Sequence, residues 1–312
     1  MSYDLAIVVP AYKPDFLKEA LESLHNQTDR RFSLYIFDDA SPHDLRIITD
    51  SVNLSDNTHF HKFEENVGGI SLVKHWNRCI RLTNNEPWIW LFSDDDLADP
   101  ECVKSFYETR KKYPDHFAYR FNTRKISANG ETIKENVFPE TFDAADFLNL
   151  KLSYSQESYV VETIFSREIY DQTGGIPDLP LAWAADDLFN TQIAFFQKIR
   201  TINGPRVYWR YSDKNISGKN SRESAIPKLE ASRTFVNYIL SKKKIAQKLE
   251  PEDLPLRWYI RQIKGMLPEL SFKDQFLAVW KMGRKDRRVW KHFATMKKEK
   301  SRSYQWLKRF LS

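Results

Sequence analysis

The sequence predicts an α/β fold, in which a mostly parallel, mixed sheet is flanked by helices and followed by a basic helical segment. The first observation behind this prediction is a strand–helix–strand order near the N-terminus. Residues 5–9 and 32–37 are apolar runs typical of buried strands. Apolar residues recur between them at helical spacing, at Phe16, Leu17, Ala20, Leu21 and Leu24. This order predicts a βαβ unit with parallel strands. The second observation is that the chain reads as helix throughout from about residue 224.

The remaining elements follow the same alternation as far as about residue 115. We expect a strand at 58–63, a helix at 70–82, a strand at 88–92 and a helix after Pro100. From 115 to 180 the pattern is mixed, apart from Asn129-Gly130, which is a strong hairpin signal. A helix is then expected at 184–198 and a strand at 207–211.

Charge divides the chain into two regions. The whole chain has 48 lysines and arginines against 42 aspartates and glutamates, whereas residues 241–312 hold 20 of the first kind and 7 of the second. A mildly acidic body therefore precedes a strongly basic tail, and the two are expected to do different jobs. We predict a main α/β domain at 1–220, with halves at 1–115 and 116–220, and a basic amphipathic helical region at 221–312.

The sequence also bears on the compartment. No run of 18 or more apolar residues is present, so a spanning helix is not expected. The first residues lack the basic start and the small-residue cleavage site of a signal peptide. The two cysteines, Cys79 and Cys102, cannot form a disulfide framework. These features predict a cytoplasmic protein.

Aspartates collect where two apolar strands end. Asp38-Asp39 follows the strand at 32–37, and Asp94-Asp95-Asp96 follows the strand at 88–92. Ligands of open α/β sheets bind beyond the carboxyl ends of the strands. Mg²⁺ is often held there by one or two carboxylates plus substrate phosphates. The pattern therefore indicates a site for Mg²⁺ or Mn²⁺ and a diphosphate. The alternative is a solvated acidic loop whose Asp caps a helix.

A set of short motifs, in a fixed order over about residues 4–217, resembles the family 2 glycosyltransferases, which have the GT-A fold and use nucleotide sugars. The motifs are carried by residues 6–13, 37–41, 65–69 with 76–78, 91–96, 165–167 with 174–176, 186–188, and 208–211 with 215–217. Each motif is weak alone, and the resemblance rests on the ordered set.

The resemblance implies a nucleotide-sugar site along the first half of the chain. It assigns the nucleoside to Pro10, Ala11 and Tyr12, the base and ribose to Asp38 and Asp39, the lower face of the nucleotide to Asn66, Gly69, Asn77 and Arg78, and the diphosphate to Asp94 and Asp95. The metal, Mn²⁺ or Mg²⁺, is expected on Asp95 and Asp96. Lys13, Lys74, Arg78 and Arg210 are candidates to contact phosphate or to be solvated surface charges.

The resemblance also implies the catalytic base and the stereochemistry. It places the general base at Asp187, with Asp186 as the fallback, and implies inversion at the anomeric carbon. A paired Asp at a helix start is also a common cap. Trp183 is expected either to stack on an acceptor sugar or to pack in the core.

Three departures from the family pattern leave details open. Ser93 replaces the first Asp of the metal motif, which leaves the choice of metal ligand among Asp94, Asp95 and Asp96 open. Asp186 replaces a Glu. Tyr211-Ser212 stands where a His often follows, which puts a phosphate or metal contact from that position in doubt.

The basic tail has the pattern of amphipathic helices. Its apolar residues at helical spacing are Val289, Trp290, Phe293, Trp306, Leu307, Phe310 and Leu311, and lysines and arginines lie between them. Aromatic residues opposite basic ones suit an anionic membrane surface, on the inner face of the plasma membrane. Packing on the body and a homodimer contact are alternatives, and nucleic acid is not expected to bind.

We therefore expect a metal-dependent enzyme that moves a sugar from a nucleoside-diphosphate donor, UDP being favoured, to a hydroxyl of a glycan or lipid-linked glycan, in cell-surface polysaccharide synthesis. One alternative is a catalytically inactive scaffold of the same fold with a basic interaction tail. Another is nucleotidyl transfer on a related sheet, which the lack of a Gly-rich phosphate loop disfavours.

Overall fold

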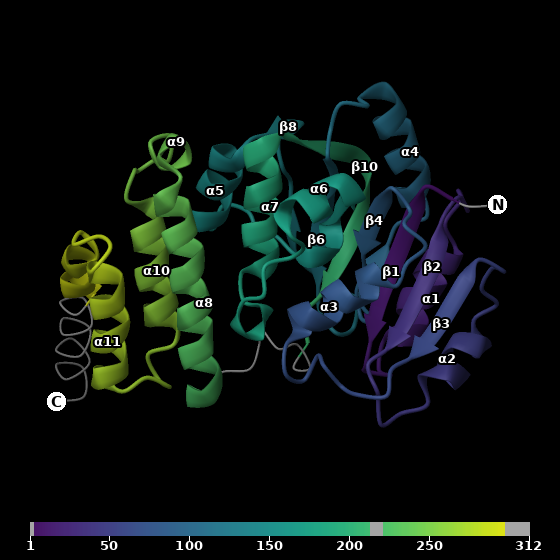
Figure 1. Ribbon diagram of the computed structural model, residues 1–312, viewed down its shortest axis with the longest axis horizontal. Helices are drawn as coiled ribbons and strands as arrows, with labels where there is room; N and C mark the ends of the chain where they lie inside the picture. The colour runs from purple at the N-terminus through teal and green to yellow at the C-terminus, as the bar shows by residue number, and fades with distance from the viewer. Residues whose placement is uncertain (1–2, 213–220, 297–312) are drawn as a thin grey trace.

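The computed structural model describes residues 3–212 and 221–296, and in them ten strands form one mixed sheet with helices on both faces (Figure 1). The strand order is β3-β2-β1-β4-β9-β6-β10-β5, with β7 paired to β6 and β8 paired to β10. The predicted α/β class is therefore confirmed.

The first half of the sheet is parallel. Its strands are β1 (Leu5–Ala11), β2 (Ser33–Asp38), β3 (Thr58–Lys62) and β4 (Trp88–Leu91), and its helices are α1 (Leu17–His25), α2 (Leu45–Ser51) and α3 (Leu72–Arg81). β1 pairs in parallel with both β2 and β4, which confirms the βαβ unit. Because β1, β2 and β4 are covered on both faces, nearly all of their residues are buried, as their apolar sequences predict.

The second half of the sheet is mixed. β9 (Thr163–Ser166) runs antiparallel to β4 and to β6 (Ala118–Ile126), and β6 pairs in parallel with β10 (Ile199–Arg210). The short strands are β5 (Leu97–Ala98), β7 (Thr132–Asn136) and β8 (Thr141–Phe142). The predicted hairpin turn joins β6 to β7, with Gly130 at φ 83°. β10 is longer than the predicted strand at 207–211, because its first residues continue the pairing with β6 across a bulge.

Short helices connect these strands. They are α4 (Cys102–Lys112), α5 (Ala144–Leu152), α6 (Arg167–Thr173), α7 (Ala185–Phe196) and the 3₁₀ turns η1 (Val160–Glu162) and η2 (Pro180–Ala182). Asp143 caps α5 and, together with Asp146, completes a capping box that satisfies the first backbone N–H groups of the helix. α5 and α7 lie against one another and against the C-terminal helices (Figure 1).

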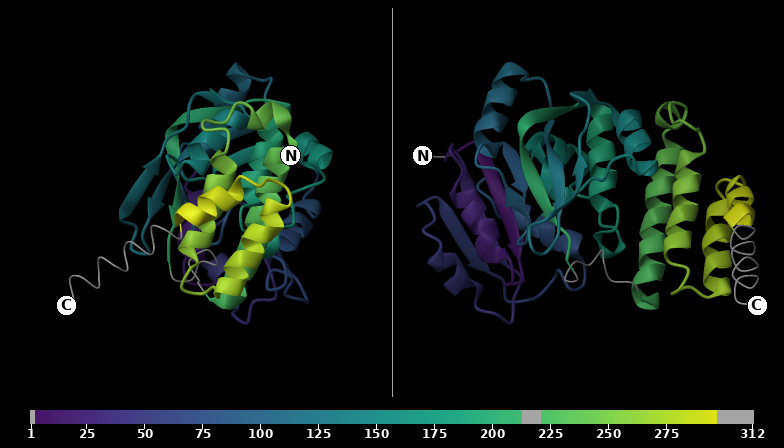
Figure 2. Two further views of the ribbon diagram at one scale, coloured as in Figure 1. Left: turned by 90° about the vertical axis from the view of Figure 1, so that its left-hand side faces the viewer. Right: turned by 180° about the vertical axis from the view of Figure 1, so that it is seen from behind.

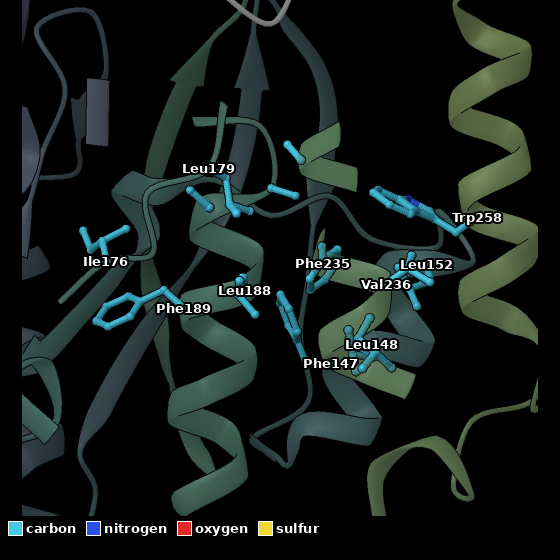
Figure 3. Close-up of a cluster of buried hydrophobic side chains, with 14 of the residues drawn as sticks. Phe147, Leu148, Leu152, Ile176, Leu179, Leu188, Phe189, Phe235, Val236 and Trp258 are labelled. Atoms are coloured by element: carbon cyan, nitrogen blue, oxygen red, sulfur yellow. The ribbon is translucent and has the colours of Figure 1, made fainter. Parts of the chain in front are cut away.

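The C-terminal helices pack on the body of the protein. They are α8 (Arg222–Ser241), α9 (Lys243–Ala246), α10 (Leu254–Gly265) and α11 (Phe272–Gly283). Phe235 and Val236 of α8 and Trp258 of α10 share one apolar cluster with Phe147 and Leu148 of α5 (Figure 3). The right-hand view of Figure 2 places α8, α10 and α11 beyond α7, at the end of the molecule remote from β3.

This packing bears on the predictions made for the tail. Val289 and Phe293 are buried in the same cluster, so these two apolar residues face the protein interior. Trp306, Leu307, Phe310 and Leu311 lie outside the described residues, as does the motif at 215–217. The boundary at 220 borders an undescribed stretch and stays a prediction. Within the described ranges, no helix is both long and apolar enough to span a bilayer.

Candidate active site

A cavity of about 980 Å³ opens at the carboxyl ends of β1 and β4. Asp39, Asp95 and Asp187, which are far apart in the sequence, all line it. One wall comes from the turns after β1, β2 and β4. The opposite wall comes from the segment between α5 and β9, from η2, from the start of α7 and from α10. The cavity thus lies between the parallel half of the sheet and the C-terminal helices.

Eleven of the fifteen predicted site residues line this cavity. They are Pro10, Ala11, Tyr12, Asp39, Asn66, Gly69, Asp94, Asp95, Trp183, Asp186 and Asp187. The other four, Asp38, Asn77, Arg78 and Asp96, do not line it, although each lies directly behind a residue or segment that does.

Two of these four hold loops. The Asp38 carboxylate accepts a hydrogen bond from the Ser41 backbone N–H (2.7 Å) and lies 3.4 Å from the Lys62 ammonium, at 1% exposure. The Asn77 side chain donates to the Ile176 carbonyl (2.9 Å) and accepts from its N–H (3.1 Å). Their contacts thus fix the loop after β2 and the segment after α6.

The other two predicted residues that do not line the cavity support its carboxylates. Arg78 donates to Asp39 and stacks over the Phe63 ring, 3.6 Å from its centroid. Asp96 is fully buried and accepts from the Arg210 backbone N–H at 2.8 Å. Arg210 itself is occupied by the carbonyls of Asp95 and Ala128 and by Glu19, so its guanidinium serves the fold.

Asp39 is bound by donors on several sides. Its carboxylate accepts from the backbone N–H groups of Val67 (3.0 Å) and Gly68 (2.7 Å). Nδ1 of His75 lies 3.3 Å away but is itself an acceptor, for Nε of Arg78 at 3.0 Å. A Cβ at Gly68 would lie 2.4 Å from Oδ2 of Asp39, so only glycine allows this approach. Burial lowers the pKa of His75 to about 4, and the imidazole is therefore neutral at physiological pH.

Asp94 and Asp95 have different partners, and their roles in the site differ accordingly. Asp94 accepts from the backbone N–H groups of Tyr12 (2.9 Å) and Lys13 (3.0 Å) and so fastens the turn after β1 to the turn after β4. Burial, reinforced by the neighbouring charge of Asp95, raises the pKa of Asp94 to about 6. Asp95 instead pairs with the Lys13 ammonium, 3.2 Å away, at the cavity surface.

The carboxylates present fit a cation that shares its ligands with a substrate. Within residues 3–212 and 221–296, no cluster of three or more His, Cys, Asp or Glu side chains could hold a metal. Asp96 is turned toward β10. Asp94 and Asp95 both line the cavity, but Oδ2 of Asp94 is occupied by two backbone N–H groups, so Asp95 is the better placed of the two to share a cation. One carboxylate plus diphosphate and water oxygens is an ordinary ligand set for Mg²⁺.

On the opposite wall, Asp187 is paired with a lysine that the sequence did not reveal. Its Oδ1 lies 2.9 Å from the ammonium of Lys151 on α5, and both side chains are largely buried. Burial lowers the pKa of Lys151, but the carboxylates of Asp187 and Asp186 outweigh it and raise the pKa overall. Burial and the charge of Asp187 raise the pKa of Asp186 to about 8, so this carboxyl is mostly protonated at neutral pH.

Trp183 is half-buried on the same wall. Its indole Nε1 donates to Oγ of Ser232 on α8 (3.1 Å), and the ammonium of Lys228 lies 4.8 Å from the ring. One part of the indole therefore packs against the C-terminal helices while another lines the cavity. Both predicted roles of this tryptophan, stacking surface and core residue, are compatible with this position.

Sequence reasoning missed several residues of this wall. They are Lys151, Tyr154, Tyr159, Trp209, Trp258 and Gln262. The rings of Tyr159 and Trp209 stack at 4.3 Å with 5° between their planes. Trp209 at least belongs to a motif of the ordered set, at 208–211. The others carry no local signal, because α5, the segment after it and α10 reach the cavity only through tertiary packing.

A mixed sheet whose parallel half ends at a cavity with carboxylates on two facing walls matches the architecture of GT-A glycosyltransferases. The model of glycosyl transferase family 2 matches residues 6–169, which is just over half of the chain. The chain therefore belongs to glycosyl transferase family 2. Among the curated proteins, none matches it.

Solved structures share this fold at low sequence identity. S. aureus TarS (residues 1–349) in complex with UDP-GlcNAc superposes with a TM-score of 0.69 at 19% identity, covering 91% of this chain and 82% of that one. The mannosyltransferase PcManGT from Pyrobaculum calidifontis, in complex with GDP-Man and Mn²⁺, superposes with a TM-score of 0.55 at 16% identity, covering 95% and 85%. At these identities the likeness shows the fold alone.

Proposed function

We propose that this chain transfers a sugar from a nucleoside-diphosphate donor, UDP-linked, to a hydroxyl of a glycan or lipid-linked glycan, with inversion of the anomeric centre. The observation that carries the proposal is the meeting of Asp39 and Asp95 with Asp187 across one cavity. A donor diphosphate at Asp95 would have its sugar pointing toward Asp187, and an acceptor hydroxyl would enter from the side of α10.

The donor wall supports a nucleoside diphosphate. Pro10, Ala11 and Tyr12 offer an apolar edge beside Asp39, and the backbone at Gly68 and Gly69 is open to close approach. The TarS and PcManGT complexes contain UDP-GlcNAc and GDP-Man, respectively, in proteins of the same fold. UDP is our choice for this chain, on the family resemblance.

In the mechanism, Asp187 accepts the proton of the acceptor hydroxyl as that oxygen attacks the anomeric carbon. The Lys151 ammonium, 2.9 Å from Oδ1 of Asp187, holds that side chain in place for the transfer. Lys13, beside Asp95, contributes positive charge where the leaving diphosphate gathers negative charge. A divalent cation held by Asp95 and the diphosphate would stabilise that leaving group as a Lewis acid. Attack from the face opposite the leaving group inverts the centre.

The test is transfer or donor hydrolysis with UDP-sugars and GDP-sugars in Mn²⁺ or Mg²⁺, compared with excess chelator. Asp187→Asn is expected to lower kcat by roughly 10² to 10⁴ without weakening nucleotide binding. Full activity of Asp187→Asn would show that Asp187 is not the general base. Full activity in excess chelator would show that the reaction needs no metal.

A non-catalytic scaffold of the same fold is the alternative from another class. It would need neither cation nor nucleotide, so thermal unfolding separates the two cheaply. An enzyme of the proposed kind unfolds at a higher temperature when UDP and Mn²⁺ are both present, because ligands that bind only the folded state stabilise it. A scaffold shows no such shift.

Peripheral attachment to an anionic membrane, where polysaccharide synthesis takes place, remains part of the proposal. Val289 and Phe293 are buried and cannot contact a membrane, so the exposed apolar residues of α11 support this attachment instead. Phe272, Phe276, Leu277 and Trp280 are 43% to 65% exposed on this helix. Exposed lysines and arginines flank them, at Lys273, Lys281, Arg284 and Lys285. Cosedimentation with phosphatidylglycerol vesicles but not with phosphatidylcholine vesicles is expected, and Trp280→Ser is expected to weaken it. A homodimer through this face would instead double the sedimenting mass without lipid.

A further inference from the structure

Strained backbone gathers on the α10 side of the cavity. Six non-glycine residues in the described ranges have a positive φ, and four of them, Tyr154, Leu181, Ala182 and Ala184, line the cavity. Such conformations are costly for residues with a Cβ, and they persist where the surroundings hold them, most often at ligand sites. The donor wall has none of the six in its lining. The four positive-φ residues therefore indicate a ligand site on the α10 side of the cavity.

Tyr154 stands out among the four because it is bulky. It has φ 65°, follows α5 by two residues, and keeps 45% of its surface exposed at the cavity. A large aromatic residue in the left-handed region is a genuine outlier. An exposed ring held in this conformation does little for the core, so its place calls for another explanation.

Two residues of α10 hold the ring from behind. The amide Nε2 of Gln262 donates to Oη of Tyr154 at 2.6 Å. The guanidinium of Arg261 lies 5.5 Å from the ring centroid, and its Nη1 donates to the Ser153 carbonyl at 3.5 Å. The backbone N–H of Tyr154 bonds to the carbonyl of Lys151, whose ammonium contacts Asp187. Tyr154 is thus tied to both α10 and the carboxylate proposed as base.

The same helix presents a second aromatic residue to the cavity. Trp258 and Gln262 are four residues apart on α10, so they lie on one face of the helix, and both line the cavity. Trp258 packs edge-on against Phe235 of α8, with ring centroids 5.6 Å apart. The wall therefore offers an exposed ring, an amide and a firm aromatic backing.

We propose that Tyr154 and Gln262 form the acceptor subsite and that it takes a neutral sugar or polyol unit. The apolar C–H face of the unit packs on the Tyr154 ring, whose negative face attracts polarised C–H groups, and its hydroxyls bond to Gln262. The ring of Tyr154 and the amide of Gln262 carry no charge, so the surface that they present suits an uncharged unit. The inference rests on the proposed function, because the bound unit presents its hydroxyl to Asp187.

The experiment measures glycoside binding directly and needs no identified acceptor. The probes are methyl glycosides of glucose, galactose, mannose and N-acetylglucosamine, and ribitol, tested by saturation-transfer NMR with UDP and Mn²⁺ present. At least one probe is expected to bind the unaltered chain, and Tyr154→Gly is expected to weaken it about tenfold or more. Phe196→Ala, which removes an exposed aromatic residue that does not line the cavity, is the matched control.

Glycine at position 154 separates a binding role from a structural one. Because glycine adopts positive φ freely, Tyr154→Gly is expected to unfold at no lower temperature than the unaltered chain while losing the glycoside. Tyr154→Phe keeps the ring and releases the Gln262 amide, so an intermediate loss is expected. The proposal fails if Tyr154→Gly binds the probes as before, or if no probe binds the unaltered chain.

This outcome is distinct from failure of the proposed function. Calorimetric titration with UDP and Mn²⁺ tests the donor wall in the same preparations, and the Tyr154 variants are expected to leave it unchanged. Normal nucleotide binding with no glycoside binding would overturn the subsite alone.

Discussion

The ammonium of Lys151 lies 2.9 Å from Oδ1 of Asp187, and this ion pair joins α5 to the first turn of α7 at the cavity wall. Lys151 also donates to the Ser158 carbonyl at 3.3 Å, which fixes its position. The carboxylate proposed as general base therefore sits next to a largely buried cation. The pair sets where this carboxylate points.

Replacing Lys151 is expected to harm the reaction more than the binding of donor. Lys151→Met leaves a buried carboxylate without its partner, which costs about 3 to 5 kcal/mol of stability. The value of kcat is expected to fall, because Asp187 loses the contact that holds its side chain in place, and Lys151→Arg is expected to restore part of it. The measurements are thermal unfolding and kcat.

Lys248→Met serves as the control for this prediction. Lys248 pairs with Asp143 at 3.0 Å, but it is exposed and does not line the cavity. Lys248→Met should therefore leave kcat unchanged. An unchanged kcat for Lys151→Met would show that the ion pair does not position Asp187.

Asp186→Asn is expected to stabilise the free protein, more strongly as the pH rises. The pKa of Asp186 is about 8 in the folded state, well above the ordinary value of an unfolded Asp. The unfolded chain therefore releases this proton first, and the carboxyl costs stability increasingly from about pH 4 to about pH 8. The gain in unfolding temperature over the unaltered chain should be larger at pH 8 than at pH 5. Asp171→Asn, on an exposed part of α6, should show no such trend.

Substitutions of Asp95 and Asp96 are expected to differ in their effect on metal-dependent affinity for UDP. Asp95→Asn removes the carboxylate that faces the cavity, so affinity for UDP in Mn²⁺ should fall by at least about tenfold, since even indirect support of a metal is worth that much. Asp96→Asn keeps an oxygen for the Arg210 N–H and should bind UDP normally. Titration calorimetry with and without Mn²⁺ distinguishes them, and equal losses would contradict this assignment.

Gly68→Ala is expected to disturb Asp39 and weaken donor binding. The new Cβ would lie 2.4 Å from Oδ2 of Asp39, so the carboxylate or the loop at 66–69 must move. We expect a loss of about 1 to 3 kcal/mol in unfolding free energy and weaker UDP affinity. Gly265→Ala, at the end of α10 with open space around it, should leave both intact. Normal UDP affinity in Gly68→Ala would mean that Asp39 needs no such close contact.

The donor wall could be predicted because its signals are local. An apolar run marks each parallel strand, and the residue after it lies at the carboxyl edge of the sheet, so the strand pattern alone brings Asp39 and Asp95 near one another. The sequence could not tell Asp95 from Asp96. Neighbouring residues of a turn point in different directions, and only the course of β10 shows that Asp96 bonds to Arg210.

The opposite wall could not be predicted from the sequence. Lys151 is 36 positions from Asp187, and Gln262 is 108 from Tyr154, so their meeting depends on how α5, α7 and α10 pack. The prediction that Val289 and Phe293 of the tail face a membrane was wrong for a related reason. Val289 and Phe293 show the spacing of an amphipathic helix, but periodicity does not say whether the apolar face meets lipid or the protein core.

The hydrogen bond from Trp183 to Ser232 ties the turn before α7 to a helix that follows it by nearly fifty positions. Trimming the polypeptide after β10 to obtain a minimal enzyme would strip away that anchor, together with Trp258 and Gln262. It would leave the nucleotide-facing half largely complete. Specificity engineering can therefore treat the two faces as separately encoded: exchanges confined to α8 and α10 should redirect which molecule receives the sugar while sparing which molecule supplies it.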